Sequence, residues 1–208
     1  AAALVADMPF KQKVLALKYK FMTQADALLH GDLHTGSLMV NQEETFIIDP
    51  EFAFVGPFGF DIGALIANYV NMYIHHTVVT QNTEYQTWLL SIIDETLNGF
   101  ESKFLALWDN TPTAALQVSG SLGPETLNAY KQNFMQQILR DTVGFAGCKM
   151  ARRVFGVAGV AEIRGIEDPK LRKKAENMAL KIARRFVMNH ETITKIEDIR
   201  SLITHEQQ

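Results

Sequence analysis

The chain has 208 residues, of which 47% are hydrophobic and 21% charged, a composition typical of a folded globular domain. The formal net charge of -3 argues against the strongly basic face of a nucleic-acid-binding protein, and no apolar run approaches the length of a membrane span. The only cysteine, Cys148, excludes an internal disulfide and fits a reducing compartment, and its apolar neighbours favour a buried residue over a nucleophile. We therefore expect a soluble cytoplasmic protein that binds neither nucleic acid nor a membrane.

The amino-terminal part of the chain is expected to hold one helix followed by a hairpin. Apolar residues at helical spacing predict an amphipathic helix over residues 9–27. Short apolar runs separated by Gly, Asn and Pro then predict loops and two strands, at residues 38–40 and 46–48. The polar residues 41–45 would form the turn between the strands.

From residue 60 the pattern is helical almost to the end. Asp61 is placed to cap the next helix, and a second helix begins at Asn82 or Thr83. Pro112 and residues 119–124 indicate a connection. Further helices are expected at residues 125–140, 142–158 and 169–189, with a last short one opened by a capping box between Thr194 and Glu197.

Four aromatic residues in the helix that is expected to begin at Asn82 or Thr83 have helical spacing. Trp88, Phe100, Phe104 and Trp108 indicate packing in the core and not a stacking platform for a ligand. The fold class predicted from these elements is mainly α with a small β-hairpin.

Residues 28–63 hold the motifs that indicate chemistry. His30-Gly31-Asp32 lies in a loop of small residues, where Asp32 can face a cleft and accept a proton from a substrate hydroxyl. Asp49 and Glu51 are two residues apart at the end of the second strand, so an extended backbone would place both on one face. Two carboxylates with open positions suit Mg²⁺, which retains waters and accepts phosphate oxygens. Each motif alone is more often a turn or a solvated surface, so the inference depends on their order.

That order is a helix, a His-Gly-Asp loop, a short hairpin, an acidic pair and a Phe-Asp-Ile-Gly helix start. It resembles the catalytic and metal-binding loops of the protein-kinase-like superfamily, in the aminoglycoside and choline phosphotransferase branch. In the string HGDLHTGS, Ser37 stands where that branch usually has asparagine, and Asp-Pro-Glu stands where protein kinases have Asp-Phe-Gly. Both features, together with the following FAFVGPFGFDIG, are similar to the methylthioribose kinases.

The resemblance implies a role for each motif residue. Asp32 would be the catalytic base and would bind the hydroxyl of the acceptor. Asp49 and Glu51 would hold Mg²⁺ and, with Pro50 between them, orient the phosphates of ATP. Ser37 would stand at a second metal contact, although a neutral hydroxyl is a poorer ligand than an amide carbonyl.

Two residues beside these motifs are expected to support the site without reacting. Asp61 would connect the helix start to the catalytic loop. His30 would orient its neighbours and would not carry a proton.

The pair Arg152-Arg153, in the string ARRVFG, also resembles the methylthioribose kinases. Adjacent positions on a helix point about 100° apart, so at most one of the two is expected to face the cleft, and we favour Arg152. Its guanidinium would hydrogen-bond sugar hydroxyls and offset charge on the transferred phosphoryl group.

A kinase of this fold also needs a smaller amino-terminal lobe with a glycine-rich loop, a strand lysine and an adenine-binding hinge. Residues 1–29 supply none of these. We therefore expect residues 1–208 to form the C-terminal catalytic lobe of a protein-kinase-like (α+β) fold, whose partner is the N-terminal lobe of the same protein.

The resemblance implies ATP-dependent phosphorylation of the 1-hydroxyl of 5-methylthioribose, in methionine salvage, with ATP and Mg²⁺ as cofactors. Two alternatives stay open. One is an aminoglycoside- or homoserine-kinase-like activity, because the shared loops specify phosphoryl transfer and say little about the acceptor. The other is an isolated lobe that is inactive and serves as a binding module. The family also leaves open a homodimer.

Overall fold

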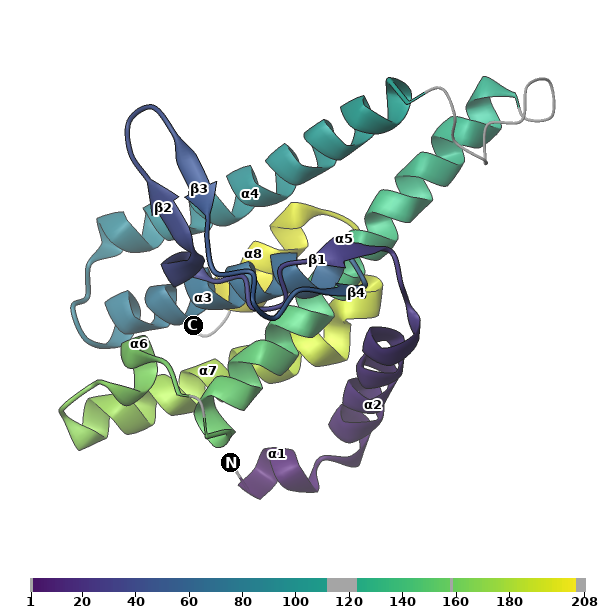
Figure 1. Cartoon of the computed structure of the whole chain (residues 1–208). Coiled ribbons are helices and arrows are strands. Elements are labelled where there is room, and N and C mark those ends of the chain that lie inside the picture. The colour runs from purple at the N-terminus through teal and green to yellow at the C-terminus, as the bar shows by residue number, and fades with distance from the viewer. Residues whose placement is uncertain (1, 112–122, 158, 205–208) are drawn as a thin grey trace.

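The computed structural model describes residues 2–111, 123–157 and 159–204, and these are mainly helical with two small pairs of strands (Figure 1). The predicted fold class is confirmed. The elements in the first part of the chain are α1 (Ala2–Ala6), α2 (Met8–Thr23), β1 (Ala27–Leu29), β2 (Leu38–Val40), β3 (Thr45–Ile47) and β4 (Phe54–Gly56). The later elements are α3 (Gly59–Val78), α4 (Thr83–Asp109), α5 (Pro124–Phe155), α6 (Ala161–Arg164), α7 (Pro169–Asn189) and α8 (Ile196–Thr204).

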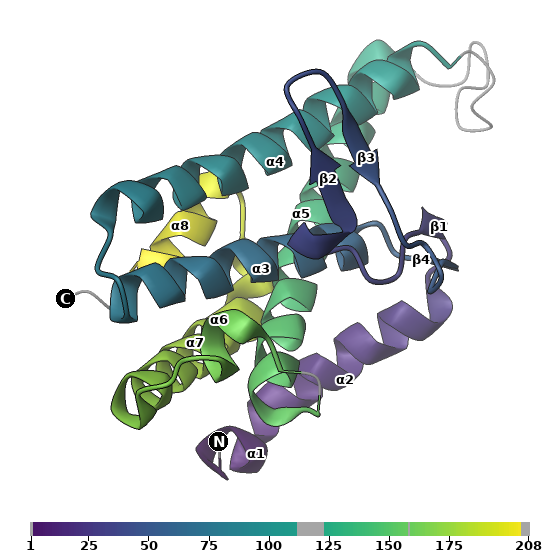
Figure 2. The ribbon, with the colours of Figure 1, turned by 60° about the vertical axis from the view of Figure 1, so that its left-hand side comes forward.

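The strands form two separate antiparallel pairs, of which the sequence predicted one. β2 pairs with β3 in the register Leu38 to Ile47, so the hairpin is confirmed. Its tip extends past α4 in Figure 1, and Figure 2 shows it in front of α4 and α5. β1 pairs with β4 in the register Ala27 to Gly56. The extension of the first helix to residue 27 was therefore wrong, because α2 ends at Thr23 and Ala27 already belongs to a strand.

The longest helix crosses a boundary that the sequence predicted. A break was expected at Asp141, but α5 runs unbroken from Pro124 to Phe155. Asp141 is 2% exposed, and its carboxylate accepts hydrogen bonds from Nζ of Lys20 on α2, at 2.8 Å to each oxygen. The polar residue thus joins two helices instead of ending one. The connection predicted before it, at Pro112 and in residues 119–122, lies outside the described residues.

Two predicted caps have different geometry in the structure. Asp61 is the third residue of α3, whose N-cap position is Phe58, so the carboxylate does not cap the helix. In the last capping motif the partner of Thr194 is Asp198 and not Glu197. The Thr194 backbone N–H and hydroxyl donate to one oxygen of Asp198, at 2.9 and 3.0 Å.

Two aromatic clusters pack around the start of α3. Phe21, Phe54 and Phe145 surround Phe60, with ring centroids between 4.9 and 5.6 Å from it. On the other side, Phe58 contacts a cluster made of Phe100, Phe104, Trp108, Tyr130 and Phe134. Phe100, Phe104 and Trp108 pack against aromatic neighbours but are only half-buried and lie outside the core cluster, so their predicted place in the core is wrong. It is wrong as well for Trp88, which is 47% exposed and lies tilted against Tyr85.

The core lies where α5 packs against α3 and α7. The residues of α3 that face it, among them Ile66, Val70 and Ile74, are completely buried. Among the described residues no helix is both long and apolar enough to cross a membrane.

Glycines set the distance between α3 and α5. A methyl group at Gly63 would lie 2.6 Å from the carbonyl oxygen of Thr142 and 2.9 Å from the nitrogen of Ala146. One turn earlier, a methyl group at Gly59 would lie 2.7 Å from the nitrogen of Thr142. The backbones of the two helices can therefore approach this closely only because these positions lack a side chain.

Substitution of Gly63 by alanine should therefore destabilise the chain. The new methyl group meets rigid backbone, so we expect Gly63→Ala to lower the free energy of unfolding by about 1–3 kcal/mol. Gly99→Ala is the matched control, because nothing lies within 4 Å of its added methyl group. That change should stabilise α4 by about 0.5–1 kcal/mol. Urea unfolding measures both, and equal effects would contradict the close crossing.

Candidate active site

The His-Gly-Asp loop is attached to the start of α3 by one buried carboxylate. Asp61 is 7% exposed, and it accepts the backbone N–H of His30 at 2.6 Å and that of Gly31 at 3.1 Å. A buried carboxylate needs such partners, and the first turn of a helix favours negative charge. The expected role of Asp61, connecting the helix start to the catalytic loop, is confirmed.

The glycine of this motif is required by its backbone. Gly31 has a φ of 86°, in the left-handed region, and an added methyl group would lie 2.1 Å from the carbonyl oxygen of Phe52. Any side chain at this position would clash with the segment that follows the acidic pair. Gly31 therefore allows the catalytic and acidic loops to lie in direct contact.

His30 and Ser37 fasten the same two loops together. Nε2 of His30 lies 2.8 Å from the carbonyl oxygen of Ile48 and Nδ1 lies 3.4 Å from the nitrogen of Asp32, so the pattern assigns the proton to Nε2. These are the contacts of an orienting group, as predicted. The buried Ser37 hydroxyl donates to the carbonyl oxygen of Asp32 at 3.2 Å, and the Ile48 N–H donates to the carbonyl oxygen of Ser37 at 3.0 Å. Ser37 thus braces the loop, and its contact with a metal stays a prediction.

The carboxylate of Asp32 faces three basic side chains. Its oxygen Oδ1 lies 3.8 Å from Nζ of Lys149 and 3.9 Å from Nη2 of Arg153, while Oδ2 lies 3.8 Å from Nε2 of His34. Each distance is longer than a hydrogen bond. The Asp32 side chain is 37% exposed, so a small hydroxyl compound can reach it from solvent.

Lys149, which lies beside Asp32, was not predicted to be part of the site. Its side chain is only 9% exposed, and Nζ lies 4.5 Å from the centre of the Phe60 ring. Burial lowers the pKa of Lys149, and the nearby Asp32 carboxylate acts in the opposite direction. The signal in the sequence was the spacing of Lys149 and Arg153, which are four residues apart and so share one face of a helix. The prediction considered the arginine pair alone.

The structure distinguishes the two adjacent arginines. Arg153 is the one whose guanidinium approaches Asp32, and its side chain is 17% exposed. Arg152, which the sequence argument favoured, is exposed at the surface of α5. Both lie close enough to Lys149 to lower its pKa further. The functional role of either arginine stays a prediction.

Asp49 and Glu51 do not lie on an extended strand, which was the geometry assumed when they were predicted to share one face. β3 ends at Ile47, Asp49 has a φ of 67°, and Glu51 begins a turn, so alternation along a strand does not apply. Asp49, Pro50 and Glu51 are all exposed. Among the described residues no group of three or more His, Cys, Asp or Glu side chains is placed to hold a metal. Two accessible carboxylates still fit Mg²⁺, which takes its other ligands from water and phosphate.

Cys148, three residues after Phe145 on α5, has the inert character that the sequence indicated. Burial raises the pKa of its thiol to about 12. The thiol therefore stays protonated near neutral pH and is not a nucleophile.

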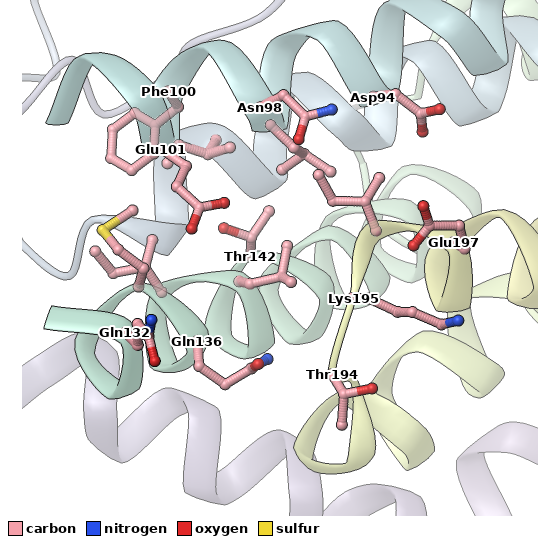
Figure 3. Close-up of a pocket in the computed structure, with 16 residues that line it drawn as sticks. Asp94, Asn98, Phe100, Glu101, Gln132, Gln136, Thr142, Thr194, Lys195 and Glu197 are labelled. Carbon is pink, nitrogen blue, oxygen red and sulfur yellow. The ribbon is translucent and has the colours of Figure 1, made fainter. Parts of the chain in front are cut away.

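A cavity of about 470 Å³ lies apart from this constellation, between α4, α5 and the segment that leads into α8 (Figure 3). Ile62 lines it, whereas Phe60, about 200° away around α3, faces Lys149. The buried Thr142 hydroxyl, with no hydrogen-bond partner among the described residues, lies beside it. The lining includes none of Asp32, Asp49 or Arg153, so the candidate active site is the accessible surface at Asp32 and not this cavity.

Comparisons with known proteins agree with the motif order. The pattern of the phosphotransferase enzyme family matches residues 2–91, which include the loops from His30 to Asp61. The chain is 40% identical over 200 residues to a methylthioribose kinase of Geobacillus sp. (strain WCH70), covering 96% of this chain and 47% of that protein. It is 37% identical over 215 residues to methylthioribose kinase 1 of Oryza sativa subsp. japonica, covering 100% of this chain and 49% of that protein.

A third relative shows the same pattern of coverage. The chain is 39% identical over 201 residues to the methylthioribose kinase of Escherichia coli O45:K1 (strain S88 / ExPEC), covering 93% of this chain and 48% of that protein. The chain thus spans about half the length of the curated relatives that it matches. It is a homologue of the methylthioribose kinases, and its residues 2–91 match the phosphotransferase enzyme family.

Proposed function

We propose that the chain is the C-terminal catalytic lobe of an ATP-dependent kinase that phosphorylates the 1-hydroxyl of 5-methylthioribose. The observation that carries this proposal is the setting of Asp32. Its carboxylate is accessible, its loop is fastened by Asp61, and basic side chains of α5 face it. Homology to methylthioribose kinases supports the choice of acceptor.

Asp32 accepts the proton of the acceptor hydroxyl while the hydroxyl oxygen bonds to the γ-phosphorus of ATP and the bond from that phosphorus to the β-bridging oxygen breaks. ADP leaves with the electron pair of the broken bond. Arg153, with Arg152 beside it, offsets charge on the transferred group and donates to sugar hydroxyls.

Asp49 and Glu51 are the residues that would hold Mg²⁺, with Pro50 fixing the backbone between them. When bound, Mg²⁺ supplies charge neutralisation for the phosphates of ATP. The left-handed backbone at Asp49 supports a functional assignment for this loop, since such strain in a residue other than glycine is often found at functional sites.

The rest of the kinase is an N-terminal nucleotide-binding lobe of the same protein. The length of the relatives supports this, because the chain covers 47% to 49% of three of them. So does the surface of the β2–β3 hairpin, where Met39, Val40, Phe46 and Ile47 are each at least 55% exposed. Large apolar side chains gathered on one element are typical of a surface that another part of a protein covers.

The charge around Asp32 separates the proposed acceptor from an aminoglycoside. A polycationic acceptor needs carboxylates around the reacting hydroxyl. The side chains facing Asp32 are His34, Lys149 and Arg153, which are basic. A neutral sugar such as methylthioribose avoids the repulsion that an aminoglycoside would meet there.

Replacement of Asp32 by asparagine tests the reaction. In the full-length protein, Asp32→Asn should lower kcat by about 10²-fold or more, because the general base is lost, while ATP binding and thermal stability stay nearly unchanged. Glu95→Gln, an exposed carboxylate on α4, is the matched control and should keep wild-type kcat. Release of ADP from Asp32→Asn at the wild-type rate would remove Asp32 from the mechanism.

Alanine at Asp49 or Glu51 tests the metal assignment. Each substitution removes one of two carboxylate ligands, so binding of Mg·ADP to the full-length protein should become too weak to measure by calorimetry. Binding of wild type should likewise disappear when EDTA removes the metal. If both variants keep wild-type affinity, the acidic pair is only solvated surface.

The arginine pair tests the acceptor. Arg153→Ala should impair the use of methylthioribose more than Arg152→Ala does, because Arg153 is the residue beside Asp32, and neither should change Mg·ATP binding. Lysine at 153 should restore little, since it lacks the planar fork of donors. The assay compares methylthioribose with homoserine, choline and an aminoglycoside. If another acceptor is phosphorylated and methylthioribose is not, the proposed kinase activity is supported and the proposed acceptor is wrong.

A further inference from the structure

Lys149 is a buried cation that makes no direct hydrogen bond to an anion among the described residues. Its side chain is 9% exposed, and the Asp32 oxygen that faces it lies 3.8 Å from Nζ. Taking an ammonium group out of water costs several kcal/mol, which a contact at this distance does not fully offset. The Phe60 ring beneath Nζ offsets a further part of the cost. For stability alone, an apolar side chain of similar length would serve at least as well here.

A second buried lysine on α5 has a direct ion-pair partner, which Lys149 lacks among the described residues. Lys131 is also buried on α5 and also lies over an aromatic ring, with Nζ 5.5 Å from the centre of Trp108. Unlike Lys149, it makes a direct ion pair, with the carboxylate of Asp109. Lys131 therefore has a structural partner. It lies eighteen positions before Lys149, near the start of α5, whereas Asp32 lies beside the end of α5 that carries Lys149.

The position of Lys149 relative to Asp32 indicates its use. Lys149 and Arg153 are four residues apart on α5, so successive turns of one rigid helix direct two cations to the same oxygen, Oδ1 of Asp32. His34 faces the other oxygen. The charges that surround the carboxylate therefore come mainly from α5, whereas Asp32 itself lies in a loop. A helix can fix the direction of a loop carboxylate more firmly than the loop can.

We propose that Lys149 is a positioning residue for Asp32, whose ammonium group holds the carboxylate in the orientation that receives the proton of the acceptor hydroxyl. The separation of 3.8 Å is compatible with this role, because the ammonium attracts the carboxylate electrostatically and the carboxylate keeps its lone pairs open to the hydroxyl. Packing on Phe60 keeps the ammonium in place when the acceptor arrives. This inference rests on the function proposed above, in which Asp32 is the base.

Methionine at position 149 tests the proposal, because it keeps the length of the side chain and removes the charge. In the full-length protein, Lys149→Met should lower kcat by about 10²-fold, the scale expected when a reacting group is misplaced. The KM values for ATP and the acceptor should change by less than about threefold, since a positioning residue acts on the Asp32 carboxylate and not on the binding of either substrate. The melting temperature should stay the same or rise, because a buried charge without a direct partner has been removed.

Lys131→Met is the matched control, because it also removes a buried lysine charge from α5. It should keep wild-type kcat and change the melting temperature little, because the Asp109 carboxylate that loses its partner is 65% exposed and stays hydrated. If Lys149→Met keeps wild-type kcat, or lowers the melting temperature by clearly more than Lys131→Met does, Lys149 is structural and the proposal is overturned.

A double-mutant cycle shows whether Lys149 acts through Asp32. In the Asp32→Asn background the carboxylate is already gone, so adding Lys149→Met should lower single-turnover transfer by less than about threefold. A further fall as large as that of the single variant would overturn the proposal.

The activity of the wild-type protein separates this inference from the proposed function. If wild type transfers phosphate to no acceptor of the panel, the proposed function fails, whereas an active wild type with an equally active Lys149→Met contradicts only the role of Lys149.

Discussion

The hydrogen bonds from the backbone of His30 and Gly31 to the Asp61 carboxylate hold the site in place. Asp61 belongs to α3, and α3 lies against α5 at a distance that only glycine at positions 59 and 63 permits. The Asp61 carboxylate therefore fixes the His-Gly-Asp loop relative to the helical core. Through it, Asp32 comes within 4 Å of cations that lie more than a hundred residues later in the chain.

The charge of the site follows from the same arrangement. The loops between β1 and α3 contribute carboxylates, at Asp32, Asp49 and Glu51, whereas the facing side of α5 contributes Lys149 and Arg153. Phosphoryl transfer needs both signs, carboxylates for the proton and the metal and cations for the charge on the moving group. Two rigid elements, α5 and α3, supply the cations and the Asp61 anchor, and the loops supply the groups that we propose to react. The motif of Asp32 and the geometry around it support the same proposal for this residue.

Much of this arrangement could be predicted from the sequence, and the parts that could not have physical reasons. The motif order predicted the connecting role of Asp61, and short apolar runs separated by Gly, Asn and Pro predicted the β2–β3 hairpin, while the catalytic role of Asp32 stays a proposal. The pairing of β1 with β4 was missed because its short strands are joined only after the chain has made the hairpin between them. Asp141 was taken for a helix break because its ion pair with Lys20 depends on tertiary packing. Lys149 was missed for a related reason, since a lysine in a helical pattern normally lies in solvent.

The account is tested most directly by a structure of the full-length protein with methylthioribose and a non-hydrolysable Mg·ATP analogue. The distance to measure joins the 1-hydroxyl oxygen of the sugar to the nearer carboxylate oxygen of Asp32. We predict about 2.6–3.2 Å, the reach of a general base, with Arg153 against the sugar or the terminal phosphate. A sugar bound away from Asp32, for example in the cavity between α4 and α5, would contradict the central claim.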